Sequence, residues 1–534
     1  MTALQWSVRE RASALEKAER EGVDLLIIGG GITGAGILRD AASRGLSALV
    51  VERGDFASGT SGRSTKLIHG GLRYIAQGQL GMTRESCQER DLLFRLNPHL
   101  VRPIPFVWPV YENSKTPLWQ VRAALFAYWG LASFRSSARY QMLGPERVAD
   151  FSKDLRRDGL RGAGFFHDCQ VDDARLVLET LASARRLGGE AVNHAEVFEF
   201  LRGDEGRIVG VRVRDKENGE SRAIRAEVVV NAAGPAVERV RGLDRPVARP
   251  ELRPAKGVHL VIPRCRVHCE SAIVLEARDG RHLSLIPWDE VALIGTTDSF
   301  TDQIDEPLVS IEEVHYMLST ANDAFPHLAL TTNDIRSAFA GVRPLVADAD
   351  DESPSNSVSR EHKIYDDPSG LISVTGGKLT TYRTMAEGVV KQALDRLPEE
   401  RRAAAGPSLT GNLPLREDEF EVAELEADLQ ARYGLAAHRV AHLVRTHGLD
   451  AEELLREAEP ELLRPIGESR YTYAEIPWCL RTECAVTLCD LLEHRMRLAL
   501  FAIGQGLPEL EEITRTAAAA AGWDSDRARE EASS

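Results

Sequence analysis

The chain has 534 residues, with 66 Lys and Arg against 81 Asp and Glu, and a formal net charge of −15. A chain this acidic is a poor candidate for general nucleic-acid binding, so an anionic small molecule would have to be held by a local cluster of Arg and Lys. A hydrophobic content of 43% with 28% charged residues is typical of globular proteins, and the length allows about two to four domains.

The cysteines and the N-terminal residues favour a reducing, cytoplasmic location. The seven cysteines include no C-x-x-C pair, which is typical of free thiols. Residues 1–22 are polar and charged and lack an apolar core, so they do not resemble a secretory signal. No run of about eighteen uncharged apolar residues occurs, so no membrane-spanning helix is predicted.

Residues 24–52 carry the most informative pattern near the start of the chain. An apolar run at residues 25–28 predicts a strand that is buried on both faces. Gly29, Gly31 and Gly34 follow with the spacing G-x-G-x-x-G, and a helical pattern continues to about residue 44. A second strand is predicted at residues 48–51 and is followed by Glu52, eighteen residues after Gly34.

This arrangement predicts a dinucleotide site rather than a plain glycine-rich turn. The three glycines allow a tight turn, the approach of a pyrophosphate and close packing of helix on strand. The helix N-terminus offers unpaired N–H groups to phosphates, and Glu52 can hold a pair of ribose hydroxyls. The same carboxylate would repel a 2′-phosphate, which argues against NADP but leaves NAD and FAD open.

Residues 55–74 contain four glycines and five Ser or Thr residues and little that could form a core. A segment of this length without predicted secondary structure is usually functional or disordered. Its donors suit an extended path along a long polar ligand, and His69, Arg73 and Tyr74 could reach a reactive ring and an anionic substrate. The alternative is a surface loop.

Further elements follow in chain order. Helices are predicted at residues 81–96 and 174–187, and strands near residues 106–110, 164–173, 191–206, 208–214, 226–230 and 371–374. The stretches 252–263 and 281–295 predict an antiparallel layer. Small-residue turns at Ala233-Gly234 and Gly376-Gly377 end two of the strands, so each could face a bound cofactor.

The segment 117–134 is rich in aromatic and aliphatic residues but contains Arg122. We favour a helix packed in the core, and the alternative is a helix that lies on a membrane surface. Residues 398–414 are typical of a linker, and residues 524–534 of a disordered tail. Helices are predicted between them at residues 420–433, 437–447, 451–458, 482–500 and 510–522.

Several longer motifs together resemble a known family. They are Ile28 to Gly36, Ser64 to Tyr74, Cys169 to Val177, Asn231 to Pro235, Ala255 to His259, Ile294 to Asp298, Gly341 to Leu345 and Gly376 to Arg383. In this order they resemble the FAD-dependent, respiratory glycerol-3-phosphate dehydrogenases of the D-amino-acid-oxidase-like flavoprotein superfamily. The stretches at residues 66–74 and 376–383 are the most specific, and the C-terminal helices resemble the family more loosely.

The resemblance implies an α/β fold with a Rossmann-like FAD-binding domain, an antiparallel-sheet substrate domain and an all-α C-terminal domain. The core would span residues 23–397, after an N-terminal extension at 1–22. Its FAD-binding parts would be about 23–80, 165–245 and 338–397, and its substrate-domain parts about 95–164 and 246–337. A linker at 398–414, a helical domain at 415–523 and a disordered tail at 524–534 would follow.

The resemblance also decides the cofactor as FAD. The adenosine diphosphate half would lie on the glycine loop and Glu52, and the ribityl chain and ring along residues 61–69. The cofactor-binding residues would be Gly29, Gly31, Ile32, Thr33, Gly34, Glu52, Arg53, Thr60, Ser61, Ser64, Thr65, Lys66, His69, Gly70, Ala233, Gly234, Gly377, Lys378, Leu379 and Thr380. No metal is expected.

For the substrate, the family pattern implies Arg73, Tyr74, His259, Arg343, Arg360 and Lys378. Arginine forks pair bidentately with phosphate oxygens, so Arg343 and Arg360 are expected to bind the phosphate. Lys378 and Arg73 would stabilise alkoxide charge. A proton acceptor that titrates near neutrality favours His259, with His69 as the runner-up. The expected catalytic set is therefore His259, Arg343, Lys378 and Arg73.

The expected reaction oxidises sn-glycerol 3-phosphate to dihydroxyacetone phosphate by hydride transfer from C2 to flavin N5. Electrons would pass to a membrane quinone, with the protein attached peripherally to the inner face of the cell membrane, and a homodimer is conceivable by analogy. One alternative is an oxidase that reduces O2 to H2O2, although the long insertion common in such oxidases is not seen. The other is a flavin-binding scaffold without catalysis, which the full set of Arg, Lys and His disfavours.

Overall fold

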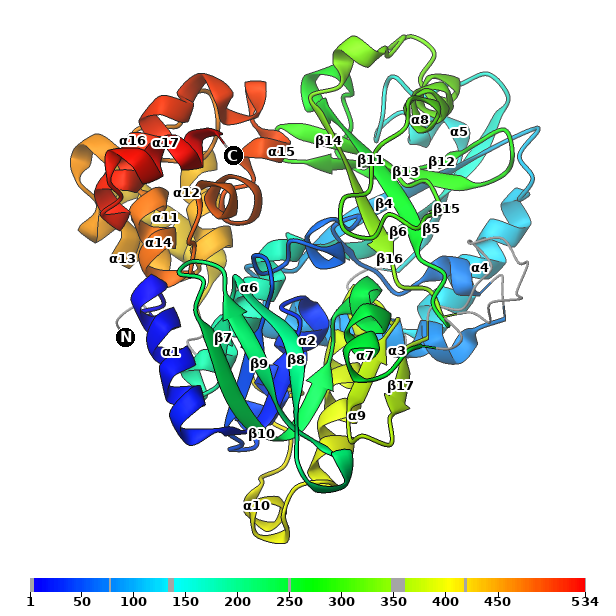
Figure 1. The fold of residues 1–534 in the computed structure, drawn as a ribbon. Coiled ribbons are helices and arrows are strands. Elements are labelled where there is room, and N and C mark those ends of the chain that lie inside the picture. Colours follow the sequence, from blue (N-terminus) through cyan, green and yellow to red (C-terminus); the bar gives the residue numbers. More distant parts are fainter. Residues whose placement is uncertain are drawn as a thin grey trace.

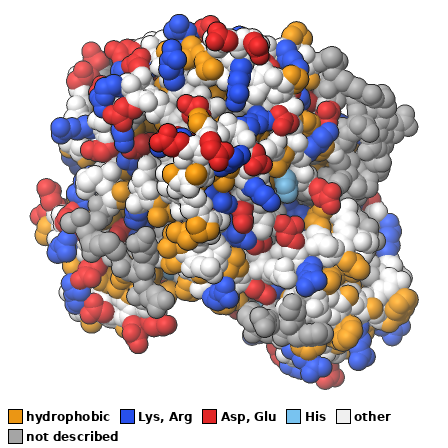
Figure 2. Space-filling view, turned by 90° about the horizontal axis from the view of Figure 1, so that it is seen from below, with side chains coloured by type: hydrophobic (Ala, Val, Ile, Leu, Met, Phe, Trp, Pro, Cys, Tyr) orange, Lys and Arg blue, Asp and Glu red, His pale blue; other side chains and the backbone are white. Residues whose placement is uncertain are grey.

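A computed structural model of the chain describes residues 4–75, 78–132, 139–247, 251–346, 361–416 and 420–533. The chain forms two sheet-based regions and a helical region at its C-terminal end (Figure 1). Acidic and basic side chains are interspersed over the face seen from below (Figure 2). No helix in the described residues is long and apolar enough to cross a membrane.

The first sheet contains the glycine loop and is parallel at its centre. Strand β1 pairs in parallel with β2 and β10, and β10 pairs in parallel with β18. The path through the sheet is β17 (Lys363–Asp366), β18 (Ile372–Thr375), β10 (Ser221–Asn231), β1 (Val23–Ile28), β2 (Ala48–Val51) and β7 (Glu190–Val192). A hairpin of β8 (Ala195–Arg202) and β9 (Ile208–Asp215) continues from β10.

Both faces of β1 are buried, which explains its unbroken apolar run. Ile27 lies in the core shared with helices α2 (Ile32–Ser43), α6 (Asp173–Arg186) and α9 (Tyr382–Leu394). Leu26 faces the other core, to which α1 and the β8–β9 hairpin contribute. Because successive side chains of a strand point to opposite faces, a strand between two cores cannot alternate between apolar and polar residues.

The N-terminal extension is an integral part of this first region. It forms α1 (Val8–Glu21), which begins with a capping box between Ser7 and Glu10. The Arg11 guanidinium is buried and bonds both carboxylate oxygens of Asp215, at 3.0 and 2.7 Å. A buried, bidentate pair of this kind fixes the helix against β9.

The second sheet is antiparallel apart from one parallel pair, β4 with β12. Its path is β15 (Ser299–Phe300), β11 (Ala255–Pro263), β14 (Val291–Gly295), β13 (His282–Trp288), β12 (Ala272–Glu276), β4 (Arg102–Tyr111), β6 (Leu160–Gln170) and β3 (Leu67–Ile68). In addition, β16 (Ser337–Arg343) pairs with β11, and β5 (Gln141–Leu143) with β6. Helices α5 (Pro145–Val148) and α8 (Ile311–Ala324) also belong to this region.

Two strands of the second sheet come from stretches that the sequence assigned to the FAD-binding parts. Strand β3 pairs Leu67 with Gln170, and β16 pairs Arg343 with Ala255. Residues 338–343 lie beyond the expected boundary at about residue 338, yet they pair with β11 in the second sheet. Segments that follow the glycine loop in the chain are thus hydrogen-bonded into the second sheet.

The C-terminal helices are α11 (Val422–Tyr433), α12 (Ala437–His447), α13 (Asp450–Glu457), α14 (Glu475–Thr482), α15 (Leu498–Phe501), α16 (Leu510–Ala521) and α17 (Ser525–Ser533). The single helix expected at residues 482–500 is wrong. A π-helical turn, Asp490–Arg495, follows α14, and Arg497 adopts a left-handed φ of 55° before α15. The expected disordered tail is also wrong, because α17 packs there and Glu531 accepts from the Leu488 amide.

The expected linker at residues 398–414 is packed against the first region. It contains α10 (Glu399–Ala404), and Arg39 of α2 donates to the carbonyl oxygens of Leu413 and Pro414, at 2.6 and 3.0 Å. The remaining helices are α3 (Leu80–Leu96), α4 (Leu118–Leu131) and α7 (Val237–Asp244). Helix α4 packs one face in the core, as favoured, with Val121, Leu125 and Tyr128 buried, while Trp119 and Phe126 are 68% and 57% exposed.

Candidate active site

The glycine loop has the geometry that a bound pyrophosphate requires. Gly29 adopts a φ of 115°, and a β-carbon there would lie 2.6 Å from the carbonyl oxygen of Ala232. A β-carbon at Gly34 would lie 1.9 Å from the carbonyl oxygen of Gly29. Only glycine fits either position, so strand, turn and helix approach closely enough to leave the α2 N-terminus open to phosphate.

Two of the expected cofactor residues lie beside the loop: Glu52, expected at the adenosine half of FAD, and Ser61, expected along the ribityl chain. Glu52, directly after β2, accepts hydrogen bonds from the amides of Gly30 at 2.6 Å and Gly54 at 2.9 Å. Ser61 Oγ accepts from the Ile32 amide at 2.9 Å, at the start of α2 and next to Thr33. A carboxylate and a hydroxyl thus mark the ends of the cradle that ribose and phosphate would fill. These donor and acceptor types fit FAD.

Two expected cofactor residues have other partners. Arg53 is ion-paired with Asp305 on an exposed surface. Lys66 is 0% exposed, and its Nζ lies 2.7 Å from Asp173 Oδ1. Lys66, which is expected along the ribityl chain, has its ammonium enclosed beneath the loop.

The segment 60–70 lies between the two sheets. Thr60 Oγ1 donates to the Val342 carbonyl at 2.5 Å, and Ser64 Oγ accepts from the Lys66 amide at 3.0 Å. Thr380 Oγ1 lies 3.2 Å from both the amide nitrogen and the carbonyl oxygen of His69. The two most specific sequence motifs therefore meet, although 311 residues separate His69 from Thr380.

The far wall of the cofactor site is built from two strand ends. Ala233 and Gly234 follow β10, with a left-handed φ of 55° at Gly234. Gly377 follows β18 with a φ of 80°, and a β-carbon there would lie 2.9 Å from Met385 Sδ. Lys378 and the short 3-10 helix Leu379–Thr381 come next. Strands β10 and β18 are parallel neighbours, so both turns lie at the same edge of the sheet.

Arg343 ends β16 and points across β11. Its Nη2 lies 3.1 Å from Thr296 Oγ1, and its Nη1 lies 3.6 Å from Asp298 Oδ1. Burial lowers the pKa of Arg343 against the pull of Asp298, and the nearby Arg73 lowers it further. A β-carbon at Gly257 would lie 2.3 Å from Arg343 Nη2, so this glycine makes room for the guanidinium.

His259 lies on β11, two residues after Gly257. Its Nε2 is 3.0 Å from Thr65 Oγ1, and its ring stacks on Phe339 at a centroid distance of 4.9 Å. Burial, together with the positive charges of Arg343 and Lys66, lowers the pKa of His259 to about 3. The expectation that it titrates near neutrality is wrong for the ligand-free protein, in which the imidazole is neutral at physiological pH.

The aromatic ring of Tyr74 lies next to two further cations, Lys378 and Arg73. Lys378 Nζ lies 3.9 Å from the centroid of its ring, and the Arg73 guanidinium carbon lies 5.1 Å from it. Lys378 also donates to Ser86 Oγ at 3.1 Å. Arg360, the sixth expected substrate residue, lies outside the described residues.

A polar network supports the loop at Gly70, and the sequence did not predict it. Asp168 Oδ1 on β6 accepts from the Gly70 amide at 3.1 Å, Arg90 Nη1 at 2.8 Å and the Tyr128 hydroxyl at 2.6 Å. Asp168 falls within a predicted strand, but nothing in the sequence connects it with Arg90 or Tyr128. Thr296 and Asp298, the partners of Arg343, do lie in one of the quoted family motifs.

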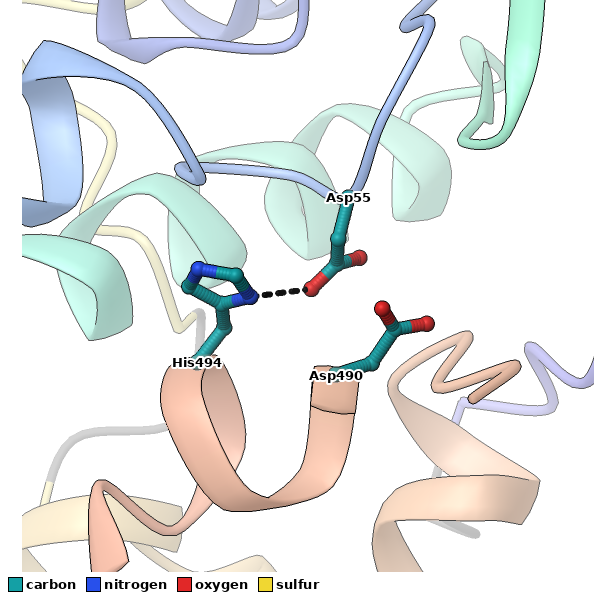
Figure 3. A group of neighbouring side chains, drawn as sticks. All are labelled: Asp55, Asp490 and His494. Atoms are coloured by element: carbon teal, nitrogen blue, oxygen red, sulfur yellow. Dashed lines mark ion pairs between the residues drawn. The ribbon is translucent and has the colours of Figure 1, made fainter. Parts of the chain in front are cut away.

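A second charged cluster lies where the first region meets the C-terminal helices. Figure 3 shows Asp55, Asp490 and His494, with His494 Nδ1 paired to Asp55 Oδ2 at 3.0 Å. Arg495 bonds both oxygens of Asp55, at 2.6 and 3.0 Å. Burial alone would raise the pKa of Asp55, but Arg495 and His494 hold it well below its usual range. The cluster therefore joins the first region to the helical region through charges of the protein itself.

Comparison with known proteins agrees with this geometry. The family model described as FAD dependent oxidoreductase matches residues 24–383, and the model for the C-terminal domain of alpha-glycerophosphate oxidase matches residues 408–528. A glycerol-3-phosphate dehydrogenase of Mycobacterium leprae is 35% identical over 530 residues, which cover 97% of this chain and 88% of the relative. The chain belongs to the FAD-dependent glycerol-3-phosphate dehydrogenase family.

Other members of the family give the same result. An aerobic glycerol-3-phosphate dehydrogenase of Bacillus subtilis is 37% identical over 412 residues, covering 77% of this chain and 74% of the relative. The crystal structure of the Bacillus halodurans dehydrogenase complexed with FAD superposes with a TM-score of 0.81 at 30% identity, covering 99% and 96% of the two chains. FAD is the cofactor of this family, and the three-part α/β architecture expected from the sequence is confirmed.

Proposed function

We propose that the protein oxidises sn-glycerol 3-phosphate to dihydroxyacetone phosphate. The observation that carries this proposal is the grouping of Arg73, Arg343 and Lys378 around Tyr74, with the neutral His259 beside them. The three cations come from different parts of the chain and have Tyr74 as a common neighbour. A phosphate monoester, with a charge of about −1.5 to −2 near neutral pH, is a ligand that such a set favours.

The residues divide the work between binding and proton transfer. FAD, when bound, supplies the acceptor for the hydride that leaves C2. Arg343 binds the phosphate, and Lys378 and Arg73 stabilise negative charge that develops on the C2 oxygen. His259 is the proposed acceptor of the hydroxyl proton, since its imidazole is in the neutral form that a base requires. Burial weakens it as a base, and the negative charge of a bound substrate phosphate would raise its pKa again. Thr65, which contacts His259 Nε2, orients the ring.

The decisive test is anaerobic addition of glycerol 3-phosphate to the purified protein. The visible absorbance of the flavin should bleach. Without oxygen, the flavin is the only acceptor for the two electrons that the substrate gives up. Glycerol and inorganic phosphate are the controls, because each supplies only half of the substrate's contacts. A flavin that stays oxidised with glycerol 3-phosphate would remove both the dehydrogenase and the oxidase from consideration.

We further propose a membrane quinone as the electron acceptor, with attachment at the inner face of the cell membrane. The names of the B. subtilis and B. halodurans relatives support a dehydrogenase. An oxidase remains the second candidate, because the C-terminal family model is described from alpha-glycerophosphate oxidase. Reoxidation of the bleached enzyme separates them: a soluble quinone analogue should restore the absorbance faster than air does.

Helix α4 offers a surface for this attachment. Trp119, Arg122 and Phe126 lie three or four residues apart and are exposed, so they share one helix face. An aromatic face that carries a basic residue is typical of helices that lie in a lipid interface. The opposite face, with Tyr128, packs against the loop at Gly70.

We expect a Trp119→Ser/Phe126→Ser protein to bind anionic lipid vesicles at least about tenfold more weakly than the wild type. Vesicle co-sedimentation measures this binding, and anaerobic bleaching should be unchanged. Leu308→Ser is the matched control, because Leu308 is 68% exposed on another surface. Unaltered binding of the double variant, or loss of binding in the control alone, would show that α4 is not the membrane-binding surface.

A further inference from the structure

A buried charge network connects the helical region to the flavin loop. Arg497, which is 2% exposed, lies between the π-helical turn and α15. Its Nη2 donates to the Gly62 carbonyl at 3.0 Å and pairs with Asp173. Asp173 in turn pairs with Lys66 and accepts from the Ser64 amide at 2.8 Å. One guanidinium from the helical region therefore holds both ends of the loop 62–66.

The network continues to the proposed base. The residue between Ser64 and Lys66 is Thr65, whose hydroxyl contacts His259 Nε2 at 3.0 Å. Lys66 Nζ lies 5.4 Å from the ring centroid of Phe339, which stacks on His259. The enclosure of Lys66 also includes Phe501 of α15, whose ring centroid is 5.8 Å from Nζ. Two residues of the helical region, Arg497 and Phe501, thus lie close to the residues of this loop.

Backbone conformation indicates that the loop is held in place by its partners. Lys66 and Arg497 have φ values of 59° and 55°, in the left-handed region that residues with a β-carbon rarely adopt. Such conformations persist where the surrounding contacts over-determine them. Here the contacts are the shared carboxylate of Asp173 and the Gly62 carbonyl.

We propose that Arg497 is a positioning residue for the flavin, and that the helical domain is for this reason part of the active site. The guanidinium fixes the backbone of residues 62–66 in the conformation that receives the cofactor and that sets Thr65 against His259. The inference rests on the proposed placement of FAD along this loop. It assigns the C-terminal domain a role in holding the cofactor, in addition to packing against the core.

A purely structural role predicts a different result, and the protein contains a matched pair with which to compare. Arg175 of α6 is also buried and bonds both oxygens of Glu483, at 2.6 and 3.0 Å. This pair joins the same two regions but makes no contact with residues 62–66 among the hydrogen bonds of the described chain. Substitutions at Arg175 therefore weaken the junction without changing the loop directly.

The experiment compares Arg497→Gln, Arg497→Lys and Arg175→Gln holoenzymes. The rate of FAD release on dilution, followed by flavin fluorescence, should rise about tenfold in Arg497→Gln, because differences in affinity are expressed mainly in the dissociation rate. The rate of flavin reduction at saturating substrate should also fall. Arg497→Lys keeps the charge but lacks the second nitrogen, Nη1, which donates to the Glu493 carbonyl at 3.1 Å, so it should rescue only part of the loss.

In Arg175→Gln we expect a lower Tm, with FAD release within about twofold of the wild type. If Arg497→Gln does not fold, Arg497→Lys decides, since its release rate must still rise by about threefold or more. Wild-type FAD release in a folded Arg497 variant, or equal acceleration in the Arg175 variant, would overturn the proposal. FAD release is measured without substrate. A wild-type protein that binds FAD but is not bleached by glycerol 3-phosphate would therefore refute the proposed function and leave the role of Arg497 unaffected.

Discussion

An Arg343→Ala protein should show a KM for glycerol 3-phosphate that is raised by about a hundredfold or more, with FAD still bound. Hydrogen bonds to a charged group contribute about 1.5–3 kcal/mol each, and a guanidinium can make two of them to one phosphate. In the structure Arg343 is half-buried beside Thr296 and Asp298, with Gly257 leaving room for it. The guanidinium is therefore oriented before the substrate arrives, and little further ordering opposes binding.

Steady-state kinetics with a soluble quinone analogue would measure the effect. Arg343→Lys tests the geometry, because a lysine keeps the charge without the planar fork and should recover only part of the affinity. Arg281→Ala is the control: Arg281 lies in the same region, where its Nε bonds Asp279 at 2.7 Å on an exposed surface. An unchanged KM in Arg343→Ala would place the phosphate elsewhere, with Arg73 as the next residue to substitute.

The glycine loop shows what a local pattern can predict. The spacing of Gly29, Gly31 and Gly34 was sufficient to place a strand, a tight turn and a helix. Gly34 is confined by the Gly29 carbonyl, which is close in the sequence, whereas Gly31 faces Ser61 and Gly29 faces the Ala232 carbonyl of the segment after β10. A predicted strand end at residues 231–235 already hinted at that neighbour.

Contacts between distant segments could not be derived in the same way. Lys66 lies in one of the most specific motifs, yet its ammonium faces Asp173 and Arg497 rather than the cofactor. Arg497 is 431 positions further along the chain and belongs to no recognised motif, so no periodicity or spacing relates the two. The place of β16 in the second sheet could not be derived for a similar reason, because its pairing with β11 is decided by tertiary packing.

The C-terminal errors have a different origin. The apolar spacing of residues 482–500 fits a continuous helix, but the structure interrupts it with a π-helical turn at Asp490–Arg495. This turn directs Asp490 to His194 and Arg495 to Asp55, both in the first region. Interactions with another region thus outweigh local helix propensity, and such π-helical turns are frequent at functional sites.

A His259→Asn protein should keep its FAD but reduce it about 10²–10⁴-fold more slowly with glycerol 3-phosphate, the usual contribution of a general base. Asparagine can retain a polar contact with Thr65 but cannot take the proton. Anaerobic stopped-flow absorbance measures the reduction rate. His282→Asn is the control, since His282 lies in the same sheet with its ring 5.2 Å from that of Trp108.

The pKa of about 3 for His259 adds a condition on the pH profile. A base works in its neutral form, and a pKa lowered from 6.5 leaves His259 neutral throughout the range from pH 5 to 7. The kcat/KM of the wild type should therefore fall toward acid pH only as the substrate phosphate is protonated, with a pKa of about 6. The same decrease toward acid pH should remain in His259→Asn.

A decrease with a midpoint near pH 6.5 that occurs only in the wild type would show that His259 titrates near neutrality in the working enzyme. A wild-type reduction rate in His259→Asn would instead make His69, at the Thr380 contact, the better candidate for the base.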